Sequence, residues 1–311
     1  MKSPGFDFEA IVKNFRIEAG FQDARPYGSG HIHDTFLIRT TEESADDYLL
    51  QRINHHVFRN VPHLMSNIER VTNHIRGKIS QSPSLKEAMK CLTFIPARDG
   101  RYYYQDRSGS YWRMVIFIPD SRSYDVVDSP ERAYAGGKAF GRFQALVADL
   151  PPECLHETIP SFHDVEKRLD EFFDTVRRDL AGRAREVSAE IEFVSHRAEQ
   201  MKCISRLGRE GKIPLRVTHN DTKFNNILFD REDRAVCVID LDTVMPGYIH
   251  YDFGDAIRTA ASTAAEDEKD LSRVAMDIRM FEALSRGFLE ETRSFLTPIE
   301  IKTLAFGAKL L

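Results

Sequence analysis

A dense group of polar side chains lies between two apolar runs in RVTHNDTKFNNILFD, residues 216–230. Its polar members are His219, Asp221, Lys223, Asn225 and Asn226. Buried polar groups are costly unless each is hydrogen-bonded or solvated, so a cluster of this kind between two strands indicates a functional site. A further apolar run, AVCVID, follows and ends in Asp240, with Asp242 two residues later.

Phosphoryl transfer needs the kinds of side chain found here. The protein must orient an acceptor hydroxyl, receive its proton and neutralise charge on the phosphates. Asp221 can take the proton, and Asn226 and Asp240 can hold Mg²⁺ through oxygen atoms. Lys223, two residues after Asp221, can reach the same phosphate. We therefore expect Asp221 and Lys223 to be catalytic.

The same loop could instead be a turn between strands, with Asn and Asp side chains capping backbone groups. The flanking apolar strands and the downstream Ile-Asp-x-Asp pattern favour the catalytic interpretation.

A second acidic motif, Asp-Phe-Gly at residues 252–254, competes for the metal-binding role. Asp252 lies 12 residues beyond Asp240 and would begin a helix, where an acidic side chain caps backbone N–H groups. A carboxylate at a strand tip beside the catalytic loop is better placed for a metal. We therefore assign Mg²⁺ to Asn226, Asp240 and Asp242. We assign structural support of the loop to Asp252 and His219.

The first part of the chain reads mainly as strands, at residues 27–40 and 47–54. The polar stretch TEESAD between them is typical of a hairpin turn. Apolar residues at helical spacing predict a helix over about 60–78. Two further strand-like runs, CLTFIP and YWRMVIFIP, flank the turn signal RDG.

After Pro119 long helical patterns take over, at about 130–149, 163–181 and 187–208. Strands followed by helices indicate an α+β protein with two lobes. We expect an N-terminal nucleotide-binding lobe over residues 1–119 and a C-terminal catalytic and acceptor-binding lobe over 120–311. A cleft between such lobes is a favoured place for ligands.

The composition favours a small-molecule partner. The 311 residues carry a net charge of −5, which gives no electrostatic reason to expect nucleic acid or an anionic membrane. No apolar run approaches the roughly 20 residues that span a bilayer. Reduced thiols in a cytoplasmic protein are the expected state of the four scattered cysteines, Cys91, Cys154, Cys203 and Cys237.

At these motifs the chain resembles the aminoglycoside phosphotransferase and choline kinase superfamily. The spacing His-x-Asp-x-x-x-x-Asn is also the catalytic-loop pattern of protein kinases. The segments VTHNDTKFNNILFD, VIDLDTVMPG and HYDFGDAIR are similar to the N-acetylhexosamine 1-kinase branch, as are YGSGHIHDTF and HETIPSFHD. The resemblance runs from about residue 20 to the C-terminus.

The resemblance implies a bilobal protein-kinase-like fold. A small N-terminal lobe would hold an antiparallel sheet and one helix, and a larger C-terminal lobe would be mainly helical. It also implies an ATP- and Mg²⁺-dependent enzyme that phosphorylates the anomeric hydroxyl of an N-acetylhexosamine, with Asp221 as catalytic base and Asn226 and Asp240 as metal ligands.

Nucleotide-binding residues follow from the same resemblance. The loop GSGH would lie near the phosphates, and it comprises Gly28, Ser29, Gly30 and His31. On their own, two glycines in a hairpin turn more often serve positive φ than phosphate binding. Backbone groups of Phe117 and Ile118, at the expected hinge between the lobes, would bind adenine.

The chain departs from a protein kinase where the third strand should carry a Lys. We expect Arg52, paired with Glu69 on the helix at 60–78, to hold the α- and β-phosphates; a solvated surface Arg is the alternative. His31 and His33 are expected to be hydrogen-bonded structural residues, with contact to phosphate or sugar hydroxyls as the alternative.

Two further points concern the acceptor. The chain stops inside an amphipathic helix, whereas members of this branch usually continue, so we expect part of the acceptor pocket to lie beyond residue 311. Two other functions remain open. One is a kinase of another alcohol acceptor, such as an aminoglycoside, choline or an amino alcohol. The other is a nucleotide-binding module without catalytic activity.

Overall fold

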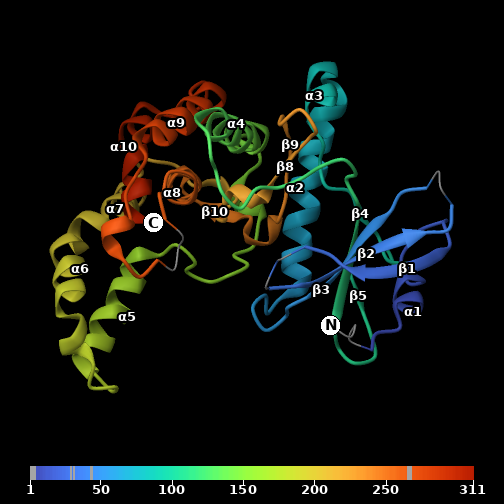
Figure 1. Ribbon diagram of the computed structural model, residues 1–311, viewed down its shortest axis with the longest axis horizontal. Coiled ribbons are helices and arrows are strands. Elements are labelled where there is room, and N and C mark those ends of the chain that lie inside the picture. The colour runs from blue at the N-terminus through green and yellow to red at the C-terminus, as the bar shows by residue number, and fades with distance from the viewer. Residues whose placement is uncertain (1–4, 29, 31, 43–44, 265–267) are drawn as a thin grey trace. The chain divides into compact units, whose positions relative to one another are not determined.

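The computed structural model describes residues 5–28, 30, 32–42, 45–264 and 268–311. The chain forms two compact units (Figure 1). Unit 1 contains Met1–Arg122 and Leu228–Asp242, and unit 2 contains Ser123–Ile227 and Thr243–Leu311. The segment Leu228–Asp242 therefore packs with the N-terminal part of the chain, although the sequence analysis grouped it with the C-terminal lobe.

An antiparallel sheet with the order β1-β2-β3-β6-β4 forms the centre of unit 1, and β5 also pairs with β6. The strands are β1 (Phe21–Pro26), β2 (Asp34–Thr40), β3 (Tyr48–Ile53), β4 (Phe94–Ile95), β5 (Tyr104–Gln105) and β6 (Tyr111–Ile116). The strand expected over 27–40 begins only at Asp34, because Gly28 takes a positive φ of 77° and ends β1. The sequence analysis missed β1.

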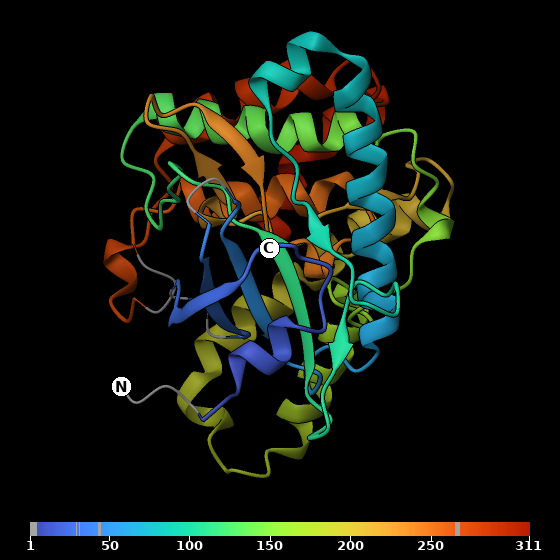
Figure 2. The same cartoon turned by 90° about the vertical axis from the view of Figure 1, so that its right-hand side faces the viewer.

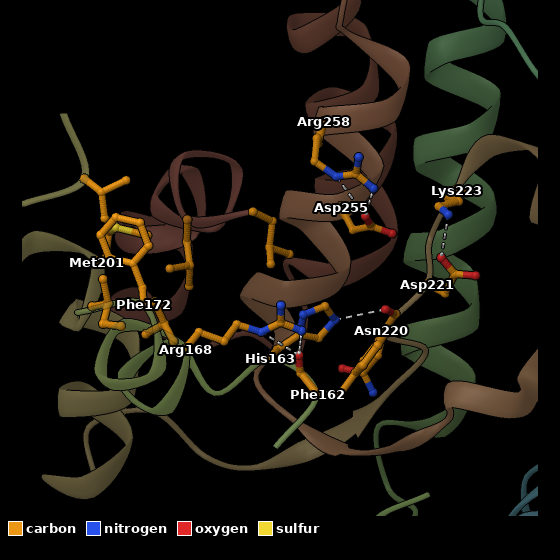
Figure 3. Close-up of a pocket in the computed structure, with 15 residues that line it drawn as sticks. Phe162, His163, Arg168, Phe172, Met201, Asn220, Asp221, Lys223, Asp255 and Arg258 are labelled. Atoms are coloured by element: carbon orange, nitrogen blue, oxygen red, sulfur yellow. Dashed lines mark hydrogen bonds and ion pairs between the residues drawn. The ribbon is translucent and has the colours of Figure 1, made fainter. Parts of the chain in front are cut away.

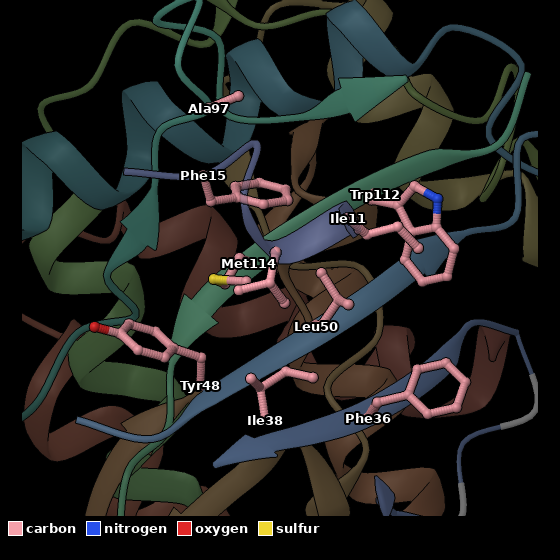
Figure 4. Packing of buried hydrophobic residues seen from close by; sticks show 10 residues of the cluster. Ile11, Phe15, Phe36, Ile38, Tyr48, Leu50, Ala97, Trp112 and Met114 are labelled. Atoms are coloured by element: carbon pink, nitrogen blue, oxygen red, sulfur yellow. The ribbon is translucent and has the colours of Figure 1, made fainter. Parts of the chain in front are cut away.

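One face of this sheet packs against α1 (Phe8–Val12), as Figure 2 shows. Alternate residues of each strand point to the same face, and the buried cluster follows this period of two (Figure 4). The members of this cluster that come from the three central strands are Phe36, Ile38, Tyr48, Leu50, Trp112 and Met114. Ile11, Val12 and Phe15 complete the cluster from the N-terminal segment.

The helix expected over about 60–78 is α2 (Val61–Gln81). Asn60 caps it by accepting a hydrogen bond from the His63 N–H. The predicted apolar stripe is buried, and it consists of Val61, Leu64, Ile68, Val71 and Ile75. A short helix, α3 (Pro83–Ala88), follows directly and was not expected.

A hairpin of β8 (Ile227–Phe229) and β9 (Ala235–Val238) delivers the acidic motif of unit 1. Arg122 and Phe229 exchange two backbone hydrogen bonds of 2.9 and 2.8 Å. The Lys90 N–H donates to the Val236 carbonyl at 2.6 Å. These bonds attach the hairpin to the rest of unit 1, and Asp240 and Asp242 follow the end of β9.

Unit 2 is mainly helical (Figure 1). Its helices are α4 (Pro130–Val147), α5 (Val165–Arg178), α6 (Ser188–Met201), α7 (Cys203–Arg209), α8 (Ile249–Ala260), α9 (Ile278–Thr292) and α10 (Pro298–Leu310). Helix α4 packs on α9, and α8 packs on α10. The single helix expected over 187–208 is broken at Lys202 into α6 and α7. Strands β7 (Arg216–Thr218) and β10 (Met245–Gly247) pair antiparallel beside α8.

The Phe253-Gly254 pair inside α8 serves helix packing. Phe253 makes edge-on contacts with Phe281 and Phe288, with ring centroids 6.4 and 5.4 Å away. A Cβ atom on Gly254 would lie 2.3 Å from the backbone C and O atoms of Gly307 on α10. The two helices therefore approach so closely that only a hydrogen atom fits between them at this position.

The expected α+β class is confirmed, with the antiparallel sheet in the N-terminal part and the helices in the C-terminal part. No helix in the described part of the chain combines the length and apolar character needed to cross a bilayer. The four cysteines are free thiols.

Replacing Gly254 by Ala should lower the free energy of unfolding by about 1–3 kcal/mol, because the added methyl overpacks the contact between α8 and α10. Gly77, inside α2, is the matched control, since a Cβ there meets nothing within 4 Å. Gly77→Ala should stabilise the protein by about 0.5–1 kcal/mol through helix propensity. Urea unfolding of both variants measures the two effects, and effects of the same sign would contradict this account.

Buried His250 predicts a pH dependence of stability. Its Nε2 bonds Thr303 Oγ1 at 2.9 Å, and its Nδ1 has no partner among the described residues. Burial lowers the pKa of His250 to about 4. Between pH 6.5 and pH 4 the unfolded chain therefore binds a proton that the folded chain does not, and stability falls as the pH falls.

The loss from this group is up to about 3 kcal/mol between pH 7 and pH 4. His250→Gln keeps a donor for Thr303 and does not titrate. The difference in unfolding free energy between the wild type and this variant should shrink by that amount on acidification. A difference that stays constant from pH 7 to pH 4 would show that His250 is protonated in the folded state.

Candidate functional site

The polar loop 219–226 leaves β7 and enters β8 through a 3-10 turn at Phe224–Asn226. Asn226 donates from Nδ2 to the Asp221 carbonyl at 2.8 Å and to Asp221 Oδ2 at 3.1 Å. This pair of bonds fixes the Asp221 carboxylate, which is partly exposed. Because the amide nitrogen of Asn226 faces Asp221, its oxygen points away and is the atom that could bind a metal.

Asp252, fully buried in the first turn of α8, holds the backbone of this loop. Its Oδ2 accepts from the His219 N–H at 2.8 Å and from Gln144 Nε2 at 2.6 Å. Its Oδ1 accepts from the Asn220 N–H at 2.7 Å. Burial raises the pKa of Asp252 to about 6, while His219 and the two backbone N–H groups act in the opposite direction. This is the contact pattern that a supporting residue requires.

Asn220 takes a left-handed conformation with φ of 65°, immediately before Asp221. Its side chain donates to the carbonyls of Thr218 and Thr243, and its oxygen accepts from Thr218 Oγ1. Asn tolerates this backbone region better than most residues. The turn that presents Asp221 is therefore fixed by side-chain bonds on both sides.

His219 also supports the loop. It is fully buried, and the rings of Phe140 and Phe143 pack against it at centroid distances of 6.1 and 5.5 Å. Its Nδ1 accepts from the Asp221 N–H at 3.3 Å. Its carbonyl accepts from Thr243 Oγ1 at 2.7 Å.

Lys223 lies next to Asp221, with 3.8 Å between Nζ and Oδ1. The two side chains are 41% and 26% exposed, so the pair is solvent-screened and leaves Lys223 able to reach an anionic ligand. Asp221 and Lys223 therefore present a carboxylate and an ammonium group to the same space.

That space is a pocket of about 410 Å³ within unit 2 (Figure 3). Asp221 and Lys223 lie at one end of it, and Phe172 and Met201 lie at the other. The apolar end also includes Leu169, Val194 and Leu310. The pocket thus joins a charged end that carries the catalytic candidates to an apolar end.

Four polar residues in the pocket wall were not identified from the sequence, namely His163, Arg168, Asp255 and Arg258. His163 Nε2 donates to the Asn220 carbonyl at 2.9 Å, and burial lowers the pKa of His163. Buried Asp255 accepts from Arg258 Nη2 at 2.7 Å. Asp255 and Arg258 follow Asp252 on the same helix, and this spacing was the signal in the sequence that could have identified them. Arg168 also lines the pocket, and its guanidinium donates to the Phe162 carbonyl at 2.6 Å.

The two aspartates after β9, in unit 1, differ sharply. Asp240 is exposed, with a positive φ of 59°. Asp242 is buried, and its two oxygens bond Arg113 and His33. Burial acts to raise the pKa of the Asp242 carboxyl, but Arg113 and His33 hold it well below its usual range. The geometry therefore argues against Asp242 as a metal ligand, whereas Asp240 is exposed to solvent.

The expected pairing of Arg52 with Glu69 is not what the structure contains. Arg52 bonds Asp34 through Nε at 2.6 Å, and its guanidinium lies 5.0 Å from the centroid of the Phe6 ring. Arg52 is in register with Trp112, on the face of the sheet that carries the core around α1. Glu69 is an exposed residue of α2. Because side chains alternate between the two faces along β3, Arg52 points to the face that packs against α1. Gln51 and Arg113 lie on the other face.

The remaining nucleotide-binding candidates are in unit 1. Gly28 and Gly30 belong to the connection between β1 and β2, whereas Ser29 and His31 lie outside the described residues. The Phe117 N–H donates to the Asp47 carbonyl at 2.9 Å, and the Ile118 carbonyl accepts from Ser121 Oγ at 2.7 Å. An adenine contact at this segment would therefore use the Phe117 carbonyl and the Ile118 N–H.

The chemistry of the donor set fits Mg²⁺, because Asn226 and Asp240 offer the hard oxygen ligands that this ion prefers. In the described part of the chain, no three His, Cys, Asp or Glu side chains gather into a metal-binding group. Mg²⁺ in phosphoryl-transfer enzymes is typically held by one or two protein groups together with phosphate oxygens, and such a site needs no larger cluster.

Asp252→Asn should destabilise the protein by about 2 kcal/mol or more, because an amide nitrogen replaces one oxygen that accepts from a buried N–H. Asp128→Asn is the matched control in the same unit, since Asp128 is 62% exposed and forms a surface pair with Arg132. Chemical unfolding should separate the two variants clearly. Equal stabilities would remove Asp252 from its supporting role.

Comparison with known proteins adds two findings. The model of the phosphotransferase enzyme family (APH) matches residues 23–284, which is most of the chain. Among solved structures, an aminoglycoside phosphotransferase from Alicyclobacillus acidocaldarius superposes with a TM-score of 0.65 at 12% identity, covering 100% of this chain and 84% of that one.

Two further solved structures are similar. An amicoumacin kinase in complex with AMP-PNP and Ca²⁺ has a TM-score of 0.60 at 12% identity, covering 98% of this chain and 83% of that one. A microcompartment-associated aminopropanol kinase has a TM-score of 0.54 at 17% identity, covering 97% and 85%. These likenesses confirm the predicted protein-kinase-like fold. By the family match over most of its length, the chain belongs to the phosphotransferase enzyme family.

Proposed function

We propose that this phosphotransferase is an ATP- and Mg²⁺-dependent kinase that phosphorylates the anomeric hydroxyl of an N-acetylhexosamine. The observation that carries the proposal is the pocket of unit 2, in whose wall Asp221 and Lys223 stand together. A carboxylate fixed by Asn226 at the edge of a pocket of about 410 Å³ is suited to a hydroxyl acceptor of monosaccharide size.

In the proposed reaction, Asp221 orients the acceptor hydroxyl and takes its proton. The hydroxyl oxygen forms a new bond to the γ-phosphorus of ATP, and the bond from that phosphorus to the β–γ bridging oxygen breaks. ADP leaves with the electron pair of the broken bond. Lys223 stabilises the negative charge on the transferring group.

We assign the metal to Asn226 and Asp240, and we no longer include Asp242. Bound Mg²⁺ would neutralise charge on the β- and γ-phosphates of ATP. Asn226 contributes its amide oxygen, because its nitrogen is committed to Asp221. Asp242 is committed to Arg113 and His33.

For the nucleotide, we retain the connection with Gly28 and Gly30 as the loop near the phosphates, since backbone N–H groups in such turns bind anions. Phe117 and Ile118 remain the proposed adenine contacts. The AMP-PNP and Ca²⁺ in the related amicoumacin kinase support a nucleotide and a divalent metal as co-substrate and cofactor.

The charges of the pocket wall bear on the acceptor. Three lining residues are cationic, Arg168, Lys223 and Arg258, against the two carboxylates of Asp221 and Asp255. A polycationic aminoglycoside would need an excess of carboxylates, so this balance favours a neutral acceptor such as an N-acetylated sugar. The apolar end of the pocket suits an acetyl group or another apolar substituent.

The alternative is an amino alcohol, the acceptor class named by the similar aminopropanol kinase. It would require a carboxylate free to bind the ammonium group, and the pairing of Asp255 with Arg258 disfavours it. We propose ATP and a small molecule as the partners, with no nucleic acid or membrane. Free cysteines agree with a cytoplasmic location.

An ADP-release assay over N-acetylhexosamines, plain hexoses, amino alcohols and aminoglycosides tests the acceptor. We expect Mg²⁺-dependent turnover with an N-acetylhexosamine and a product phosphorylated at the anomeric carbon. Turnover only with an amino alcohol or an aminoglycoside would move the enzyme to that acceptor class.

Asp221→Asn is the matched variant for the same assay. It should lower kcat by about 10²–10⁴-fold, as expected for loss of a general base, while ATP affinity stays near the wild-type value. Unchanged turnover in this variant would remove Asp221 from the mechanism, whatever the acceptor.

A further inference from the structure

A buried network in unit 1 surrounds Asp242, which is 2% exposed. Arg113, itself 3% exposed, places one guanidinium nitrogen on each carboxylate oxygen, with Nη2 3.0 Å from Oδ2. His33 Nε2 forms a second bond to Oδ2. Arg113 and His33, which come from different parts of the sheet, therefore both bond the Asp242 carboxylate, and both of its oxygens accept hydrogen bonds.

The bonds of His33 fix its tautomer. Its Nδ1 accepts a hydrogen bond from the Asn54 N–H at 3.0 Å, so Nδ1 carries no proton. Nε2 must then carry the proton, and it donates that proton to Asp242. His33 is thus neutral, and Arg113 is the cation that balances the buried carboxylate.

The network extends across the sheet. Arg113 Nε donates to Gln51 Oε1 at 2.9 Å, and Gln51 Nε2 donates to Thr35 Oγ1 at 3.0 Å. Residues from β2, β3 and β6 are thereby joined to the chain just after β9. All of these side chains lie on the face opposite the core around α1, because they occupy the alternate strand positions.

The two ends of this network lie beside residues with proposed roles. His33 follows Gly30 by three residues, at the end of the connection between β1 and β2. Asp242 follows Asp240 by two residues. The network thus connects the start of β2, just after the connection that carries Gly28 and Gly30, to the segment that carries Asp240, inside a single unit.

The contribution of this network to the stability of the fold does not by itself explain why the network is present. A buried ion pair costs much of its attraction in desolvation, and apolar residues of similar size often stabilise a protein equally well. Directional bonds between charged side chains can fix the orientation of the two segments that they join, whereas apolar packing is not directional.

We infer that Arg113 is a positioning residue, which acts through Asp242 and His33 to hold the segment of Asp240 and the chain at the start of β2 in a geometry suited to Mg²⁺ and nucleotide phosphate. This inference rests on the proposed function. Unlike the role considered for Arg52, this role involves no contact with the nucleotide, because all three guanidinium nitrogens of Arg113 bond Gln51 or Asp242.

The test replaces the charged pair by apolar residues of similar size, as Arg113→Met with Asp242→Leu. Binding of ATP is measured by calorimetry over a Mg²⁺ titration, with no acceptor present. We expect the thermal midpoint to stay close to that of the wild type, while the apparent Mg²⁺ affinity of the ATP complex falls about 10–100-fold, as for other residues that orient metal ligands.

The matched control removes a charged pair from the same hairpin at its other end. Arg122 and Asp233 form that pair at 2.7 Å, with side chains 53% and 37% exposed. The double variant Arg122→Met with Asp233→Asn should leave the Mg²⁺ affinity of the ATP complex unchanged.

A second variant covers the case in which the double replacement fails to fold. His33→Leu keeps the pair of Arg113 and Asp242 and removes the two bonds of the His33 ring, to Asp242 and to the Asn54 N–H, and it should show the same loss of Mg²⁺ affinity. A folded variant of either kind with wild-type Mg²⁺ affinity would overturn the inference and leave a purely structural network.

Different results would contradict the proposed acceptor and the proposed role of Arg113. Wild-type protein that binds ATP and Mg²⁺ but phosphorylates no N-acetylhexosamine defeats the acceptor assignment alone. Wild-type affinity in the network variants defeats only the positioning role of Arg113. Wild-type protein that binds no ATP defeats both.

Discussion

A buried carboxylate must have every oxygen satisfied, and Asp252 meets this constraint with the backbone of the catalytic loop itself. The N–H groups of His219 and Asn220 point at it because no other acceptor is available to them at that depth. Helix α8 therefore determines where the loop lies, and the loop determines where Asp221 lies. The packing of α8 on α10 and α9 in turn fixes the helix. The position of the Asp221 carboxylate in the pocket wall therefore depends on contacts between helices.

Each residue of the motif Asp-Phe-Gly at positions 252–254 thus makes a structural contact. Asp252 bonds the loop, Phe253 packs on the rings of α9, and Gly254 allows backbone contact with α10. The same three residue types in a protein kinase would suggest a metal ligand in a flexible segment. In this protein they lie in the first turns of a buried helix, and both carboxylate oxygens of Asp252 accept hydrogen bonds from the loop or from Gln144.

The sequence was sufficient to predict a polar loop between two strands and most of the long helices, because both depend on local spacing. Asp221 and Asn226 lie in the same short loop, so their spacing can be read directly from the sequence. The apolar stripe of α2 follows from helical periodicity. The position of Arg52 was misjudged although β3 contained the information: Leu50 and Arg52 are two residues apart and must share a face. Arg113 gave one signal, a charge inside an apolar strand, but its partner lies 129 residues away. Such pairings, like the walls of the pocket, follow from tertiary packing and strand register, which one sequence does not reveal.

Two backbone positions next to the proposed chemistry, Asn220 and Asp240, adopt left-handed conformations that cost L-residues about 1–3 kcal/mol. Glycine would adopt either conformation with less strain, so stability-guided engineering would select it at both places. At position 220 that choice deletes the side-chain bonds that lock the turn, and at position 240 it deletes the carboxylate. Thermostable descendants of this enzyme should therefore draw their stability from other parts of the chain, and a library that enriches glycine at these two positions would be selecting for inactive folds.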